Sequence, residues 1–181
     1  MPSSKKQGFS IIEMLVSISI IVIISSVLIV NFRDGEKKSR LNLSADVLVS
    51  NIRSVQNMVL NGSKFADHEM PYNGYGIYFE NSRYLIFADD NSNMVYDAGE
   101  ELNVFNFSDI SFAVSSDEGN DLNNLLFKPP KAQICANADL CALCDCNLKN
   151  SGIYSIILTQ NITGDSVNIT LNQISGRVNK E

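Results

Sequence analysis

The stretch Gly8-Phe9-Ser10-Ile11-Ile12-Glu13 opens an apolar run that extends to Val30. Glu13 is the one charged residue between Ile11 and Val30. About 20 helical residues span about 30 Å, which is the hydrocarbon thickness of a bilayer. A carboxylate inside hydrocarbon costs a few kcal/mol unless a cation or a neighbouring helix offsets that cost. The run therefore predicts a membrane-spanning helix whose single acid needs a partner.

The flanks of this run predict its orientation. Lys5 and Lys6 precede it, and basic residues favour the cytoplasmic side of a membrane. No small-x-small secretory cut site follows the run, because the next residues are Asn31-Phe32-Arg33-Asp34. We expect a single-pass protein of the cytoplasmic membrane with its N-terminus inside and its C-terminal part outside.

These N-terminal residues resemble the type IV prepilin and type II secretion pseudopilin family. In that family a short basic leader ends in Gly, and a prepilin peptidase cuts before a Phe that becomes N-methylated. A Glu stands at the fifth mature position. The resemblance implies a leader over residues 1–8, cleavage after Gly8 and a methylated N-terminus at Phe9. It also implies assembly with other pilins at an inner-membrane platform, where Glu13 pairs with a neighbour's freed amine. Alternatively, Glu13 only eases the first helical turn.

Composition fits one anchor followed by one modest extracytoplasmic domain. The chain has 181 residues and a net charge of −6, and loss of Lys5 and Lys6 with the leader changes this charge to −8. This acidity argues against a generally basic nucleic-acid surface. We expect residues 9–32 to form the transmembrane and assembly half of a long N-terminal helix. Its amphipathic half covers residues 33–61, and an antiparallel β domain covers residues 62–181.

The amphipathic half is predicted from apolar residues at alternating spacings of four and three, which share one helical face: Leu41, Ala45, Leu48, Ile52, Val55 and Val59. We expect a helix from about Glu36 to Leu60 that ends at Asn61-Gly62 and packs on a sheet. Gly35 marks a point where the helix bends or melts. A self-associating coiled coil is the competing interpretation, but the apolar repeat is short.

From Asn73 onward the chain predicts short strands. They are Tyr75 to Glu80, Arg83 to Asp89, Leu102 to Phe107, Ile110 to Val114, Leu125 to Lys128, Gly152 to Thr159 and Ser166 to Val178. Asn81-Ser82 and the segment 161–164 separate strand pairs, which predicts two hairpins. A long N-terminal helix lying across an antiparallel β-sheet is an α+β fold of the type IV pilin kind.

Within the family the chain looks most like the FimT/GspH branch of minor pilins and pseudopilins. The residues that carry this resemblance are Ile86-Phe87-Ala88-Asp89-x-Asn91-x-Asn93, Asp97-x-Gly99-Glu100 and Ile174-Ser175-Gly176-Arg177-Val178. The Cys-bearing stretch, residues 129–150, has no counterpart in this resemblance.

The loop between Asp89 and Glu100 has the spacing of a twelve-residue calcium loop. Its candidate oxygen ligands are Asp89, Asn91, Asn93, Val95 through its carbonyl, Asp97 and Glu100. Met94 stands where the calcium motif places Gly. The alternative is an Asx-rich loop whose side chains cap their own backbone.

The cysteines are confined to one segment: Cys135, Cys141, Cys144 and Cys146. Outside the cytoplasm such a cluster predicts two disulfides that staple a loop. Tetrathiolate zinc is the rival, although the spacing is not that of a regular two-knuckle site. A redox role for Cys141-x-x-Cys144 lacks the surrounding pattern of strands and helices that it needs.

No pattern in the chain indicates catalysis, because the one histidine, His68, has no nucleophile or phosphate loop beside it in sequence. We therefore expect a minor pilin or pseudopilin rather than an enzyme. The alternative is a minor pilin for DNA uptake, since Arg177 and Lys180 partly resemble the basic C-terminal segment of FimT-like proteins. Two phosphate contacts would bind DNA weakly and in a salt-sensitive way.

Overall fold

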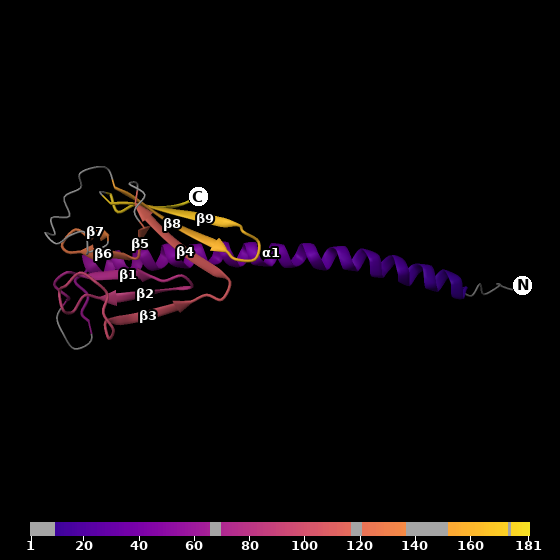
Figure 1. Cartoon of the computed structure of the whole chain (residues 1–181), viewed down its shortest axis with the longest axis horizontal. Coiled ribbons are helices and arrows are strands. Elements are labelled where there is room, and N and C mark those ends of the chain that lie inside the picture. Colours follow the sequence, from indigo (N-terminus) through magenta and orange to yellow (C-terminus); the bar gives the residue numbers. More distant parts are fainter. Residues whose placement is uncertain (1–9, 66–69, 117–120, 137–151, 174) are drawn as a thin grey trace, which may run out of the picture. The chain divides into compact units, whose positions relative to one another are not determined.

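The computed structural model describes residues 10–65, 70–116, 121–136, 152–173 and 175–181, without the side chains of residues 27–32. It contains helix α1 (Ile11–Leu60) and ten strands that form antiparallel sheets, so the predicted α+β class is confirmed (Figure 1). The chain divides into two compact units, and the second begins at Ser39 and extends to Glu181. Each unit is described separately below.

The part of α1 that belongs to the second unit buries one face. The residues with the predicted spacing are all at most 2% exposed: Leu41, Ala45, Leu48, Ile52, Val55 and Val59. Leu43 and Val47 lie off that face and are 63% and 38% exposed. The helix ends at Leu60, and Gly62 follows with a φ of 62°, a backbone conformation that glycine adopts without strain. The spacing therefore identified the packed face of this helix correctly.

The first sheet has the strand order β3-β2-β1-β6-β7. Its strands are β1 (Tyr75–Phe79), β2 (Arg83–Ala88), β3 (Glu101–Asn106), β6 (Asn124–Lys128) and β7 (Gln133–Ala136). The second sheet has the order β10-β9-β8-β4-β5. Its strands are β4 (Ile110–Ser116), β5 (Asp121–Leu122), β8 (Ile153–Gln160), β9 (Ser166–Asn172) and β10 (Val178–Lys180).

The main hydrophobic core joins the buried face of α1 to both sheets. The first sheet contributes Tyr75, Tyr84 and Phe127, each 0% exposed, and the second contributes Ile156 and Ile169, also 0% exposed. A smaller cluster lies on the other face of the first sheet and contains Leu85, Phe87, Leu126 and Cys135. The first sheet is thus covered by apolar contacts on both faces, which makes β2 a strand of almost continuous burial.

Two glycines, one just before β1 and one within it, leave room for close contacts. A Cβ on Gly74, which has a φ of 93°, would lie 2.2 Å from the carbonyl oxygen of Phe127. A Cβ on Gly76 would lie 2.4 Å from the ring of Phe87. Side chains at these positions would push β1 away from β6 and from the ring that covers it.

The predicted β1–β2 hairpin is confirmed, with Tyr78 opposite Leu85 and Phe79 opposite Tyr84. The predicted strand from Ser166 to Val178 is wrong in its length. β9 ends at Asn172, the chain turns at Gly176 with a φ of 66°, and β10 folds back onto β9. Prediction also missed β7, which pairs with β6 and lies within the predicted Cys-rich loop 129–150, and it expected one sheet where the structure has two.

Candidate functional sites

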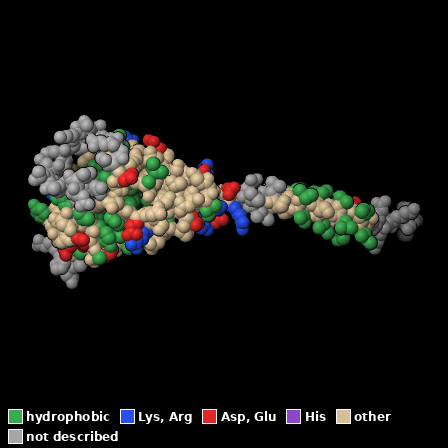
Figure 2. Space-filling model, viewed as in Figure 1, with side chains coloured by type: hydrophobic (Ala, Val, Ile, Leu, Met, Phe, Trp, Pro, Cys, Tyr) green, Lys and Arg blue, Asp and Glu red, His purple; other side chains and the backbone are tan. Residues whose placement is uncertain are grey.

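The first part of α1 presents an apolar surface. Its large apolar side chains between Ile11 and Ile24 are 51% to 82% exposed, and they form the hydrophobic patch on this part of the helix in Figure 2. Exposed apolar surface on this scale marks a site that contacts other molecules or a membrane. Within the described residues, no helix has both the length and the hydrophobicity needed to cross a membrane.

The polar side chains of this helical segment are turned back on the helix itself. Ser17 donates to the carbonyl oxygen of Glu13 at 2.8 Å, Ser19 to that of Leu15 at 2.8 Å, and Ser26 to that of Ile23 at 2.7 Å. Hydroxyls bonded in this way need no external partner. These three hydroxyls are therefore satisfied by the helix itself, and the large exposed side chains around them are apolar.

Glu13 is the exception on this surface. It is exposed, it is the one charged residue between Ser10 and Ser26, and its carboxylate has no hydrogen bond or ion pair within the described part of the chain. It lies in the first turn of α1, where an acid is favourable for the helix. Gly8 and Phe9, which the sequence predicts as the cleavage and methylation sites, lie outside the described residues.

The Asp89–Glu100 loop is organised around a buried carboxylate. Asp89 is 0% exposed. Its Oδ1 accepts from the backbone N–H of Asn93 at 3.1 Å, and its Oδ2 accepts from the N–H of Met94 at 2.9 Å and from Asn73 Nδ2 at 2.9 Å. Met94 has a φ of 67°, which bends the chain around this carboxylate. Asp89 thus fixes the loop by binding the backbone N–H groups of Asn93 and Met94 and the buried side-chain amide of Asn73.

Glu100 closes the other end of the loop in the same manner. Its Oε1 accepts from the N–H groups of Asp90 at 3.1 Å and Asn91 at 3.4 Å, and its Oε2 accepts from the N–H of Asp97 at 3.0 Å. Burial raises the pKa of Glu100, and these three hydrogen bonds oppose that rise. Glu100 is therefore a structural carboxylate at the base of the loop.

The remaining candidate calcium ligands also bond within the loop. The side-chain amides of Asn91 and Asn93 donate to Asp97 Oδ2 at 2.7 Å and 2.6 Å, and Val95 N–H donates to Asn93 Oδ1 at 2.8 Å. These bonds match the Asx-loop alternative. Among the residues that the structure describes, no group of three or more His, Cys, Asp or Glu side chains is arranged to hold a metal. Calcium binding stays a prediction.

Two side chains of the loop cover the outer face of the first sheet. Met94 and Tyr96 pack against the smaller hydrophobic cluster, and the Tyr96 ring lies 5.0 Å from that of Tyr78 and 5.7 Å from that of Phe87. The Tyr96 hydroxyl donates to Glu101 Oε1, and this hydrogen bond is the main reason that its pKa rises to about 12. The loop is thus a cover for the sheet as well as a polar turn.

Comparison with known proteins bears on the N-terminal segment. Residues 3–29 match the model of the prokaryotic N-terminal methylation motif. This match supports a type IV pilin-like protein. No curated protein and no solved structure is significantly similar to the chain.

Only one of the four cysteines lies in the described part of the chain. Cys135 is in β7, is 7% exposed and is disulfide-bonded. Cys141, Cys144 and Cys146 lie outside the described residues, so the pairing stays a prediction. A Cys135 sulfur held in a disulfide cannot be one of four zinc thiolates, which argues against the zinc alternative. The position of Cys135 in the smaller hydrophobic cluster places this bond against the outer face of the first sheet.

The two C-terminal cations, Arg177 and Lys180, already form polar contacts with other residues of the chain. Lys180 Nζ lies 2.7 Å from Asp46 Oδ1 and donates to the carbonyl oxygen of Asn42 at 3.1 Å, so it ties β10 to α1. Arg177 Nε donates to Asn179 Oδ1 at 3.0 Å. Lys180 would have to leave its carboxylate partner to contact a phosphate. DNA binding by these residues stays a prediction, and no contact in the described part of the chain supports it.

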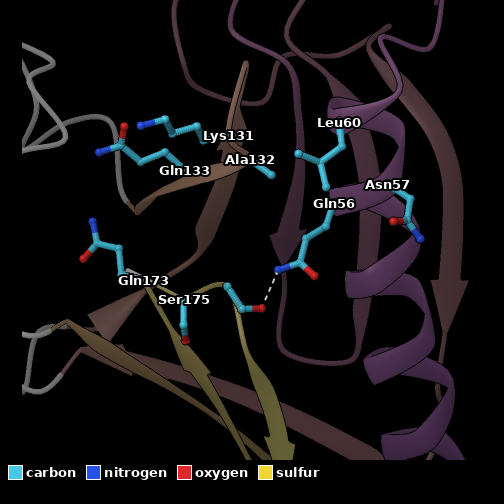
Figure 3. A pocket seen from close by; sticks show the side chains of 9 residues that line it. Gln56, Asn57, Leu60, Lys131, Ala132, Gln133, Gln173 and Ser175 are labelled. Atoms are coloured by element: carbon cyan, nitrogen blue, oxygen red, sulfur yellow. Dashed lines mark hydrogen bonds between the residues drawn. The ribbon is translucent and has the colours of Figure 1, made fainter.

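Sequence reasoning gave no signal for a polar cleft of about 410 Å³ in the second unit (Figure 3). Three distant segments line it: Gln56, Asn57 and Leu60 from α1, residues 131–133 before and in β7, and Gln173, Ser175 and Gly176 between β9 and β10. Gln56 Nε2 donates to the carbonyl oxygen of Gly176 at 2.8 Å, and this bond holds the turn to the helix. The cleft is lined mainly by side-chain amides, and Lys131 is the one charged residue among its lining residues.

Proposed function

We propose that this chain is a minor pilin or pseudopilin, a structural subunit of a type IV pilus or of a type II secretion-like filament. The observation that carries the proposal is the match of residues 3–29 to the N-terminal methylation motif. The arrangement of α1 agrees with it, because the described part of the matched segment, up to Ser26, has an apolar exterior, and its one carboxylate, Glu13, has no partner within the described residues. The resemblance to the FimT/GspH branch is part of this proposal.

Processing precedes assembly in this proposal. A prepilin peptidase removes residues 1–8 after Gly8, and Phe9 becomes the methylated N-terminus. The subunit first sits in the cytoplasmic membrane, where lipid contacts the apolar part of α1, and its β domain faces outward. The inner-membrane assembly platform then transfers it to a filament of other pilins. The domain serves a structural role in that filament and not an enzymatic one.

The physical role of Glu13 follows from the cost of a charge in an apolar layer. A carboxylate surrounded by hydrocarbon is unfavourable by a few kcal/mol, and a nearby cation reduces this cost. Cleavage creates such a cation at the amine of Phe9. Glu13 of one subunit pairs with the Phe9 amine of its neighbour, so only a processed subunit completes the contact. The apolar side chains between Ile11 and Ile24 then supply cohesion between helices, while the charge pair sets their axial register.

The test compares Glu13→Ala with Ser17→Ala. Both substitutions lie on the same helical face, but the Ser17 hydroxyl is bonded to the carbonyl oxygen of Glu13, whereas the Glu13 carboxylate has no bond within the described residues. We expect Glu13→Ala to reach the membrane at the normal level and to enter filaments at least tenfold less than wild type. Ser17→Ala should enter normally. Quantitative immunoblotting of membrane and sheared-filament fractions measures both, and normal incorporation of Glu13→Ala would contradict the mechanism.

Leader removal is tested independently of assembly. We expect Gly8→Ala to retain residues 1–8, whereas the wild-type protein should begin at a methylated Phe9. Intact-mass spectrometry of the membrane-extracted protein distinguishes these two forms. A mature Phe9 in the Gly8→Ala variant would show that the peptidase does not depend on this glycine.

A further inference from the structure

The edges of the two sheets differ in how well they are protected from pairing with other strands. β10 has three residues and ends with Lys180, while β5 has two residues. At the other edge of the first sheet, β7 has four residues. Short length and charge are the usual protections of an edge strand. β3 is the longest of these four edge strands, with six residues, and it has no lysine and no proline.

Backbone groups on the outer side of β3 have no partner within the described residues. Phe107 N–H donates to the carbonyl oxygen of Ser82 at 2.9 Å, which makes this pair a hydrogen-bonded one. Hydrogen-bonded and non-hydrogen-bonded pairs alternate along an antiparallel ladder. Val104 opposite Leu85 and Asn106 opposite Arg83 are therefore non-hydrogen-bonded pairs. The N–H and C=O groups of Val104 and Asn106 consequently point away from β2.

The side chains of β3 agree with an uncovered edge. Val104 is 44% exposed, and Asn103 and Asn106 are also exposed or partly exposed. In contrast, Phe105 is partly buried because its ring stacks on Tyr84 at a centroid distance of 4.8 Å. β3 is thus held firmly on one side, while its other side presents ordered, unpaired backbone groups.

We propose that β3 pairs with β3 of a second copy of this chain, in an antiparallel and two-fold symmetric manner. The two outward-facing residues are two positions apart, so a dyad at Phe105 places Val104 of each copy opposite Asn106 of the other. This register forms four N–H···O bonds. The residues that oppose one another around this dyad, 102–108, are all uncharged, so the like charges of Glu101 and Asp109 face each other only beyond the four bonds. A two-fold contact closes on itself and cannot propagate, so it describes subunits outside a filament.

Hydrogen exchange of single amides tests this pairing with the full chain in detergent micelles at low and high protein concentration. We expect the N–H groups of Val104 and Asn106 to exchange at least tenfold more slowly at high concentration. Phe105 N–H, which bonds to β2, should be protected at both concentrations. Because the readout is local to β3, association through the apolar helix does not imitate it.

Val104→Pro and Val104→Thr form a matched pair for this test. Proline removes the N–H of residue 104, which points away from β2. We therefore expect the amides between β2 and β3 to stay protected from hydrogen exchange. The Asn106 amide should lose its concentration-dependent protection. Threonine keeps the N–H and the branched shape, and it should behave as wild type. The proposal is overturned if Val104 and Asn106 exchange at the same rate at both concentrations in wild type, whether that rate is fast or slow. It is also overturned if Val104→Pro leaves the concentration dependence of Asn106 intact.

Discussion

The two parts of α1 differ in whether their apolar side chains are exposed or buried. Between Ile11 and Ile24 the large apolar side chains are 51% to 82% exposed, whereas the face from Leu41 to Val59 is at most 8% exposed. Carboxylates show the same contrast, because Glu13 is exposed without a partner in the described residues and Asp89 is buried with three donors. The second unit satisfies its groups internally. The first part of α1 leaves both its apolar surface and its charge for other molecules.

A pair of glycine substitutions should show the largest difference between the two units. Gly74→Ala combines a positive φ with a Cβ only 2.2 Å from the Phe127 carbonyl oxygen. We expect it to lower the free energy of unfolding by at least about 3 kcal/mol. A Cβ added at Gly35 would meet no atom within 4 Å beyond the backbone of its own helix, so Gly35→Ala should be neutral or stabilise the helix by up to about 1 kcal/mol. Urea unfolding in micelles measures the free energy of unfolding of both variants. Equal changes in the two variants would contradict the predicted difference between the units.

Two isoleucines of α1 provide the next test. Ile52 is 0% exposed and Ile20 is 51% exposed. We expect Ile52→Ala to cost about 2 to 5 kcal/mol of unfolding free energy, because it leaves a cavity in the main core. Ile20→Ala should change it by less than about 0.5 kcal/mol. Urea unfolding followed by near-ultraviolet circular dichroism reports the packing of the second unit. A large loss in Ile20→Ala would mean that the first part of α1 is packed within the same subunit.

The two carboxylates can be compared in the same way. Asp89→Ala removes the acceptor of two backbone N–H groups and of Asn73 Nδ2. We expect this to cost about 2 to 3 kcal/mol, since the buried amide of Asn73 and the Met94 N–H lose their acceptor. Glu13→Ala should unfold at the same urea concentration as wild type. If Asp89→Ala were as stable as wild type, the loop would owe its conformation to the packing of Met94 and Tyr96 instead.

The smallest predicted effect is a pH dependence from Glu100. Burial raises the pKa of Glu100 above its ordinary value of 4.5, so the folded protein binds this proton more tightly than the unfolded chain. The Glu100 contribution to stability is therefore fully present below pH 4.5 and falls as the pH rises through the raised pKa. We expect wild type to lose stability relative to Glu100→Gln over this range. Urea unfolding of both proteins from about pH 4 to about pH 7 measures the difference, and parallel curves would contradict it.

Local patterns in the sequence predicted much of the secondary structure. The spacing from Leu41 to Val59 identified the buried face of α1, and Asn81-Ser82 correctly separated β1 from β2. These features depend on neighbours in sequence, because helical and strand periodicity are local properties. The strand predicted through Gly176 failed because its apolar pattern continues across a turn. Only the pairing of β10 with β9 shows that the chain reverses there.

The candidate sites also divide into features that the sequence predicts and features that only the tertiary structure shows. Sequence alone determined the apolar N-terminal run with its single acid at Glu13, because such a run is a property of consecutive residues. Tertiary structure decided that Asp89 and Glu100 bind backbone N–H groups, that Lys180 pairs with Asp46, and that the outer side of β3 is unpaired within the described residues. The Lys180–Asp46 pair and the edge position of β3 depend on which distant segments meet, and the loop bonds depend on the backbone conformation of the loop. The tertiary structure alone determines such long-range contacts, because burial of the shared core brings distant segments together.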